Sequence, residues 1–254
     1  MRIVCAALAI AALLQPRPGA ADCRYDEPRE AGLDAVGVRR VRVDAKAGAL
    51  RIHGGTGSRV EVRGTACASS RDRLEKITLR AERDGDEVRI DVEMPEGDWS
   101  LFGGGSRLDL EIDVPESVEL DIEDSSGALE ISDVASLRLE DSSGSIEVTH
   151  VAGDVSVRDS SGEVEIEAVT GDVRISDGSG SIRVRDVRGS VTVDEDGSGS
   201  IDVSDVERDV RIGRDGSGSI RVERVGGDFT VERDGSGGIR HRDVEGRVDV
   251  PGKR

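Results

Sequence analysis

Seven aspartates recur at nearly constant spacing and are the most suggestive chemical feature of the chain. Each begins the tetrapeptide Asp-(Ser/Gly)-Ser-Gly, and the intervals are 17, 18, 18, 19, 19 and 19 residues. Carboxylate oxygens suit hard cations such as calcium, so one interpretation is a column of cation ligands. We favour the other, a turn former, because Asp accepts a hydrogen bond from its own backbone two residues further on. The seven are Asp124, Asp141, Asp159, Asp177, Asp196, Asp215 and Asp234.

Other patterns that support metal binding or catalysis are missing from the sequence. Calcium-binding β-rolls use a nine-residue repeat with Gly-Gly-x-Gly-x-Asp, which differs in both length and pattern. Zinc requires clustered Cys and His, whereas His53, His150 and His241 are scattered. The chain has no Gly-x-Ser-x-Gly, His-Glu-x-x-His, Walker or Gly-x-Gly-x-x-Gly motif. The sequence therefore predicts no catalytic residue, no cofactor and no metal site other than the less favoured Asp column.

The repeat itself predicts the architecture. Counted from the Gly that closes each tetrapeptide, apolar residues fall at offsets +2, +4, +7, +11 and +13 from the second repeat on, with His241 as an exception in the last repeat. Alternation with a period of two is typical of half-buried strands. A unit this short buries its apolar face only by stacking on its neighbours. We therefore expect an all-β protein, a β-solenoid (β-helix) of about seven regular 17–19-residue coils with two short strands each.

Two turns connect the strands of each coil. The tetrapeptide makes one turn, and the other contains an apolar residue at +7 and usually Gly at +9, as in Gly171 and Gly189. Glycine tolerates positive φ, so we expect glycines to supply that conformation in both turns. The Asp column would then lie along one edge, where water and salt screen repulsion between exposed carboxylates.

Upstream, the same alternation is present in looser form. Leu50 and Ile52, followed by a Gly-rich turn and by Val60 and Val62, resemble an early coil, and Asp84-Gly85-Asp86 indicates a hairpin. Solenoids need atypical ends that hide their open strand edges. We expect an irregular N-terminal β cap with early coils over 36–117, the regular solenoid over 118–250, a C-terminal tail over 251–254, and a blunted last edge over 247–254.

The first 21 residues indicate export. A basic start, an apolar run too short to span a bilayer and small residues at positions 19–21 are typical of a signal peptide over 1–21; an uncleaved anchor is the alternative.

Cleavage would leave 22–35 as the mature N-terminal segment and would leave two cysteines, Cys23 and Cys67. Cysteines in an exported chain usually pair, so we predict a disulfide, with two independent thiols as the alternative.

Charge limits the class of partner. The formal charge is -18, and it becomes -20 when cleavage of the leader removes Arg2 and Arg17. This balance opposes binding to nucleic acid and to anionic membranes, and no stable membrane insertion is expected after cleavage. The outward column at offset +3 changes from acidic to basic along the axis, which indicates a solvated face or, alternatively, a polarised docking surface. That column is Glu130, Glu147, Glu165, Arg183, Asp202, Arg221 and Arg240.

A leader, the opening Gly-x-Leu-x-Ile-x-Gly at 48–54 and tandem Ser-Gly-x-Ile-x-Val-x-x-Val-x-Gly-x-Val-x-Val coils resemble the bacterial envelope β-solenoids of the toastrack type. These form a domain-of-unknown-function family related to head-GIN proteins, and its members are called adhesins. The resemblance implies a non-enzymatic interaction or structural module of the cell envelope, periplasmic, surface-bound or secreted, with a partner that is a protein. The alternatives are a cation-binding scaffold using the Asp column and, less favoured, a β-helical polysaccharide-active enzyme.

Overall fold

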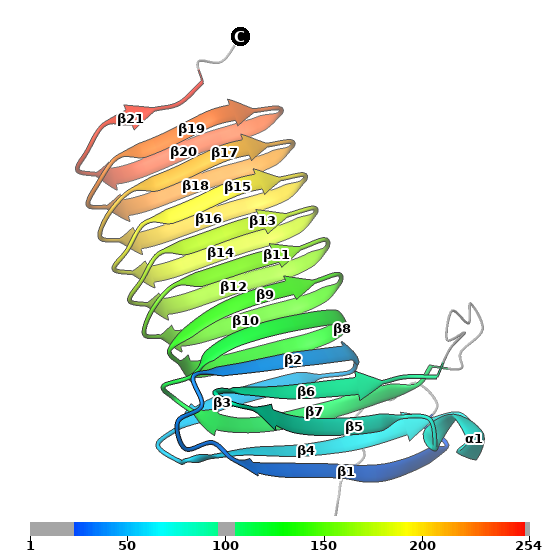
Figure 1. Ribbon diagram of the computed structural model, residues 1–254. Helices are drawn as coiled ribbons and strands as arrows, with labels where there is room; N and C mark the ends of the chain where they lie inside the picture. Colours follow the sequence, from blue (N-terminus) through cyan, green and yellow to red (C-terminus); the bar gives the residue numbers. More distant parts are fainter. Residues whose placement is uncertain (1–22, 96–104, 252–254) are drawn as a thin grey trace, which may run out of the picture.

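The computed structural model describes residues 23–95 and 105–251, and it is a nearly all-β solenoid (Figure 1). The predicted fold class is confirmed. The predicted leader over 1–21 and the last residues of the predicted tail lie outside the described residues.

The N-terminal part contains seven strands and one short helix, which the sequence did not indicate. The predicted hairpin is present, because β5 and β6 pair antiparallel around Gly85. The elements are β1 (Tyr25–Asp34), β2 (Arg40–Ala47), β3 (Leu50–Gly55), β4 (Arg59–Ala68), α1 (Arg71–Leu74), β5 (Thr78–Asp84), β6 (Glu87–Glu93) and β7 (Arg107–Pro115).

The regular coils form two parallel sheets that face each other, here called sheet A and sheet B. The long strand β8 (Glu119–Val134) belongs to both, since its first half pairs with β2 and β9 and its second half with β3 and β10. Sheet A continues through β10 (Gly144–Val151), β12 (Gly162–Val169), β14 (Gly180–Val187), β16 (Gly199–Val206), β18 (Gly218–Val225) and β20 (Gly237–Val244). Sheet B continues through β9 (Ser136–Asp141), β11 (Val155–Asp159), β13 (Val173–Asp177), β15 (Val191–Asp196), β17 (Val210–Asp215), β19 (Phe229–Asp234) and β21 (Val248–Asp249).

The cap only half follows the coil pattern. β2 and β3 stack in parallel beneath β8, so Leu50 and Ile52 occupy a true coil. Val60 and Val62 do not, because β4 runs antiparallel between β1 and β7. The expectation that Leu50, Ile52, Val60 and Val62 belong to one early coil is therefore wrong for β4, which carries the two valines. Antiparallel strands end the parallel stack below β7 in sheet A and below β6 in sheet B.

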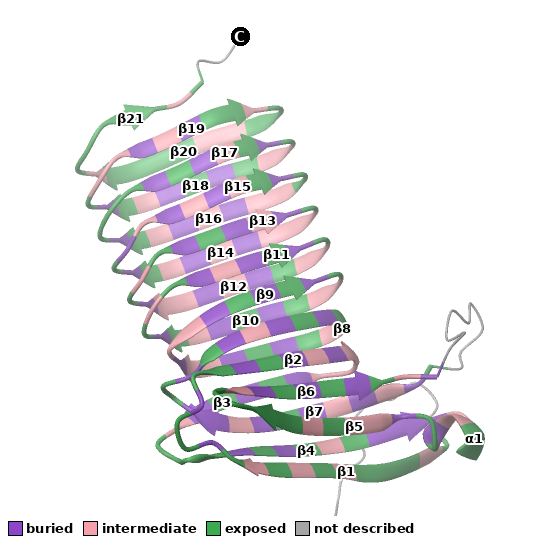
Figure 2. Ribbon diagram, in the orientation of Figure 1, coloured by how far each residue is buried: buried purple, intermediate pink, exposed green. Residues whose placement is uncertain are grey.

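The core is a ladder of small aliphatic side chains between the two sheets. In the fourth coil, Ile182, Val184 and Val187 from sheet A meet Val191 and Val193 from sheet B, and all five are at most 1% exposed. Figure 2 shows the same buried positions repeating from coil to coil. At about 1.5 to 3 kcal/mol per buried aliphatic side chain, this ladder stabilises the fold without aromatic residues.

The turns correct one expectation. The Gly of each tetrapeptide does adopt positive φ, for example 144° at Gly199. In the other turn the left-handed residue is the non-glycine at offset +6, such as Asp186 or Asp205, and the glycines at +9 are not among the positive-φ residues. Where glycine stands at +9, close stacking favours it instead: a Cβ on Gly189 would lie 2.2 Å from the carbonyl oxygen of Gly171.

Candidate functional site

The aspartates of the Asp column end the strands of sheet B and stack in register. Asp159 pairs with Asp177, Asp177 with Asp196, and Asp196 with Asp215. The expectation that these carboxylates are exposed is wrong. Asp196 is fully buried, and Asp215 is 2% exposed. The alternation Val173, Ile175, Asp177 explains why, since the same period of two that turns the valines inward also turns the aspartate inward.

The carboxyl groups of the column are poorly satisfied. Asp159 and Asp177 each accept one hydrogen bond, from the backbone N–H two residues on, at 3.1 Å. At Asp196 and Asp215 neither buried carboxyl oxygen accepts a hydrogen bond from a donor. A buried carboxylate in that condition is costly unless it takes up a proton.

Burial sets the charge state of the column. Loss of solvation, followed by the charges of Asp177 and Asp215, raises the pKa of Asp196 to about 7. Loss of solvation likewise raises the pKa of Asp124 to about 7 and that of Asp159 to about 6. Neighbouring carboxyl groups that cannot all ionise share protons, so the column carries a reduced negative charge near neutral pH.

The cation interpretation of the column remains a prediction. The described residues contain no group of three or more His, Cys, Asp or Glu placed to hold a metal ion. A hollow of about 340 Å³ lies at the cap end of the column, where Asp124, Asp141 and Asp159 lie beside Lys46 and Arg158.

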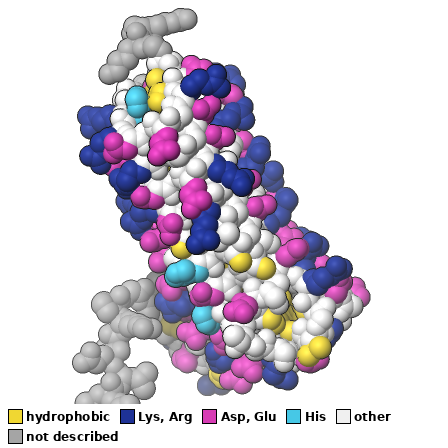
Figure 3. All heavy atoms as spheres, turned by 90° about the vertical axis from the view of Figure 1, so that its left-hand side faces the viewer, with side chains coloured by type: hydrophobic (Ala, Val, Ile, Leu, Met, Phe, Trp, Pro, Cys, Tyr) yellow, Lys and Arg dark blue, Asp and Glu magenta, His cyan; other side chains and the backbone are white. Residues whose placement is uncertain are grey.

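The outward faces of the solenoid are covered by ion pairs that cross from coil to coil. On sheet A, Arg183 lies 3.0 Å from Glu163 and 3.5 Å from Glu165, and Arg221 lies 3.3 Å from Asp202. The predicted change from acid to base at offset +3 therefore places opposite charges on adjacent strands. Exposed pairs of this kind contribute about 0 to 1 kcal/mol each. Figure 3 shows the alternation of acidic and basic side chains along the shaft.

A groove of about 920 Å³ runs over the outer face of sheet B where the cap meets the shaft. We call it the junction groove; it lies over β2, β8, β9 and the start of β11. Its arginines are held by carboxylates: Arg40 lies 3.1 Å from Glu119, and Arg138 lies 3.1 Å from Glu140. The lining residues are Arg39, Arg40, Arg42, Ser117, Glu119, Leu120, Asp121, Glu123, Ala135, Ser136, Leu137, Arg138, Glu140, Asp154 and Ser156.

Sequence reasoning did not find the junction groove. The signal was present as the basic run Arg39, Arg40 and Arg42 in a chain that is otherwise acidic. What the sequence does not show is that β2 stacks beside β8, which brings this run next to Asp121 and Glu123 from a segment about 80 positions later.

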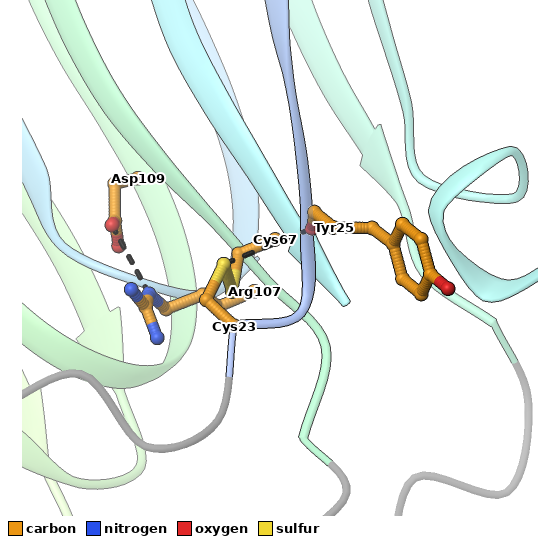
Figure 4. The surroundings of a disulfide bond; sticks show 5 residues. All are labelled: Cys23, Tyr25, Cys67, Arg107 and Asp109. Carbon is orange, nitrogen blue, oxygen red and sulfur yellow. Dashed lines mark hydrogen bonds and ion pairs between the residues drawn. A yellow bond between two sulfur atoms is a disulfide. The ribbon is translucent and has the colours of Figure 1, made fainter. Parts of the chain in front are cut away.

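The predicted disulfide is confirmed. Cys23 is bonded to Cys67 of β4, with the two Cα atoms 5.4 Å apart, within the usual range. The bond fastens the start of β1 to β4, and Figure 4 shows the Arg107–Asp109 ion pair beside it. For a sequence separation of 44 residues, chain entropy assigns the bond about 4 kcal/mol. None of the helices among the described residues is a candidate membrane span.

Comparison with known proteins identifies the fold over most of the chain. The family model described as Toastrack DUF4097 matches residues 38–246. No curated protein matches the chain.

Three solved structures are similar to the chain at low sequence identity. A "putative adhesin" from Bacteroides fragilis is 11% identical over 89% of this chain and 97% of its own, with a TM-score of 0.52. A "putative lipid binding protein" from Parabacteroides distasonis is 14% identical over 89% and 97%, with a TM-score of 0.43. A "putative cell adhesion protein" from Clostridium sporogenes is 12% identical over 89% and 99%, with a TM-score of 0.37.

Proposed function

Because the chain belongs to the Toastrack DUF4097 family, whose members carry no established activity, we propose that it is a non-enzymatic binding module of the bacterial cell envelope. In this proposal the protein is exported, and it docks a partner protein in the junction groove. The observation that carries the proposal is the groove itself, a hollow of about 920 Å³ lined by arginines and carboxylates of β2, β8 and β9.

The lining of the junction groove favours a protein as the partner. Arginines alternate with carboxylates, and the hydrogen bond from Arg138 lowers the pKa of Glu140, which keeps that carboxylate ionised at neutral pH. A surface of locally balanced charge suits another surface of mixed charge. A nucleic acid would instead require a continuous basic strip, and the chain as a whole carries -18.

Export is supported by two features that are independent of each other. The leader-like segment over 1–21 has the composition of a signal peptide. The Cys23–Cys67 bond belongs to an oxidising compartment. A binding role also agrees with the adhesin name of the Bacteroides fragilis structure, although that likeness extends to the fold alone.

The proposal is tested by reversing charge in the junction groove. The chain is expressed with its leader, purified after export, labelled, and allowed to bind envelopes isolated from its native host. We expect Arg42→Glu with Arg138→Glu to weaken binding at least about tenfold, since arginines that become buried on binding are frequent anchors of interfaces. The matched control is Arg174→Glu with Arg211→Glu, which reverses two arginines on the shaft of the same sheet.

The control should bind like the parent. Equal binding by the groove variant, the control and the parent would exclude the junction groove as the docking site. Recovery of the intact leader on a protein retained in the cytoplasm would contradict export.

A further inference from the structure

Sheet A has a free strand edge at each end of the molecule. Within the described residues β1 pairs only with β4, and β20 pairs only with β18. Figure 1 places β1 at the cap end and β20 at the opposite, C-terminal end. A free edge presents unpaired N–H and C=O groups that form hydrogen bonds with another strand.

The C-terminal end also leaves core positions uncovered. Phe229 and the inward aliphatic residues of the preceding coils are buried. In the last coil, Ile239 and Val244 are only half-buried, and Val248 is 38% exposed. We predicted that residues 247–254 would cover this edge. In the part that the structure describes, β21 pairs with β19 through only two residues, so it covers a short stretch of sheet B and none of sheet A. Figure 2 shows the change from buried to exposed colours at β20 and β21.

The two free edges carry opposite charge. The outward, exposed side chains of β20 include Arg240 and Arg242. Those of β1 include Asp26, Glu30 and Asp34. On the inward side, β20 carries Ile239 beside His241, whose ring lies 6.0 Å from that of Phe229. The inward side of β1 carries Ala31 and Leu33, which pack against the core, beside the half-buried Arg29.

The two free strands, β1 and β20, also run in the same direction. β1 is antiparallel to β4, and β4 is antiparallel to β7, so β1 runs parallel to β7. β7 is parallel to β3, β3 to β8, and so on through to β20. If one copy is stacked on the next, β20 and β1 form a parallel pair like those of the shaft, with inward faces kept inward.

We propose that copies of this chain associate end to end, with β20 of one copy pairing with β1 of the next. A two-fold arrangement is disfavoured, since it sets the arginines of two β20 strands, or the carboxylates of two β1 strands, against each other. The head-to-tail contact joins two different surfaces and therefore extends into a filament rather than closing as a dimer. Pro28 removes one donor from β1, which keeps the contact weak and reversible.

The test uses the exported, oxidised protein in sedimentation velocity over a range of concentrations. We expect a series of elongated species at successive multiples of the monomer mass, which diminishes with added salt because the ends attract by charge. Reversing the basic end with Arg240→Glu and Arg242→Glu should lower the association constant at least about tenfold. Reversing the acidic end with Glu30→Arg and Asp34→Arg should do the same.

Mixing the two end variants restores complementary ends and should restore the series, which also shows that both variants are folded. The shaft variant Arg174→Glu with Arg211→Glu is the control and should associate like the parent. A protein that stays monomeric at every concentration, association that stops at two copies, or a mixture that remains monomeric would each overturn the proposal.

Discussion

Replacing Asp196 by Asn should make the solenoid less sensitive to rising pH. Asp196 is fully buried, its carboxyl oxygens accept no hydrogen bond from a donor, and burial raises its pKa from 3.8 to about 7. A raised folded pKa gives stability that is fully present below the unfolded pKa and is lost as pH rises through the folded one. The parent should therefore be more stable at pH 5 than at pH 8, and the loss should be smaller in the variant.

The size of the effect follows from linkage. For one group moving from 3.8 to about 7, the stability lost between pH 5 and pH 8 is about 3 kcal/mol. In a chain of this length that corresponds to a difference of about 6 to 12 °C in melting temperature. Any cost of placing an amide at this site is nearly the same at both pH values, so the difference between pH values isolates the titration.

The assay is thermal unfolding followed by circular dichroism at pH 5 and pH 8. The matched control is Asp202→Asn, which removes a half-exposed carboxylate paired with Arg221 on the outer face of sheet A. The control should keep the pH dependence of the parent. The same pH dependence in Asp196→Asn as in the parent would refute the reasoning that the buried column titrates near neutrality.

Val184→Asp places an unpaired charge in the fully buried ladder and should cost several kcal/mol; a melting curve equal to that of the parent would show that this position is not inward. A Cβ on Gly199 would lie 1.4 Å from the Gly180 carbonyl oxygen, so Gly199→Ala should lower the melting temperature strongly, and an unchanged value would contradict that close approach. The denatured, unreduced protein should show no free thiol from Cys23 or Cys67, and two titratable thiols would contradict the bond. Calcium and magnesium should shift the melting temperature slightly and equally; a large calcium-selective rise would support a cation-binding Asp column.

The regular coils were predictable because one physical rule generates them. An inward residue every second position, repeated every 17 to 19 residues, permits few structures other than two stacked sheets. The same rule also covered Asp177, which continues the alternation from Val173 and Ile175. Treating it as a surface turn residue because it is acidic led to the wrong expectation of exposure.

The cap was less predictable because its strands pair out of sequence order. β2 and β3 lie between strands that come later in the chain, and β1 is held in place by pairing with β4 and by the disulfide. Periodicity reports which face of a strand is buried, but it does not report which strand lies beside it. The junction groove forms where β2 lies beside β8, and this pairing is known only from the three-dimensional structure.

The central claim is that the junction groove docks an envelope protein, and site-specific photo-crosslinking in living cells tests it most directly. A photoreactive residue is placed at Ser136, which lines the groove, and in a second strain at Thr192, an outward residue of β15 on the shaft of the same sheet; both are half-buried. The account expects one discrete crosslinked protein from Ser136 and none from Thr192. Equal products from both positions, or none from Ser136, would contradict it.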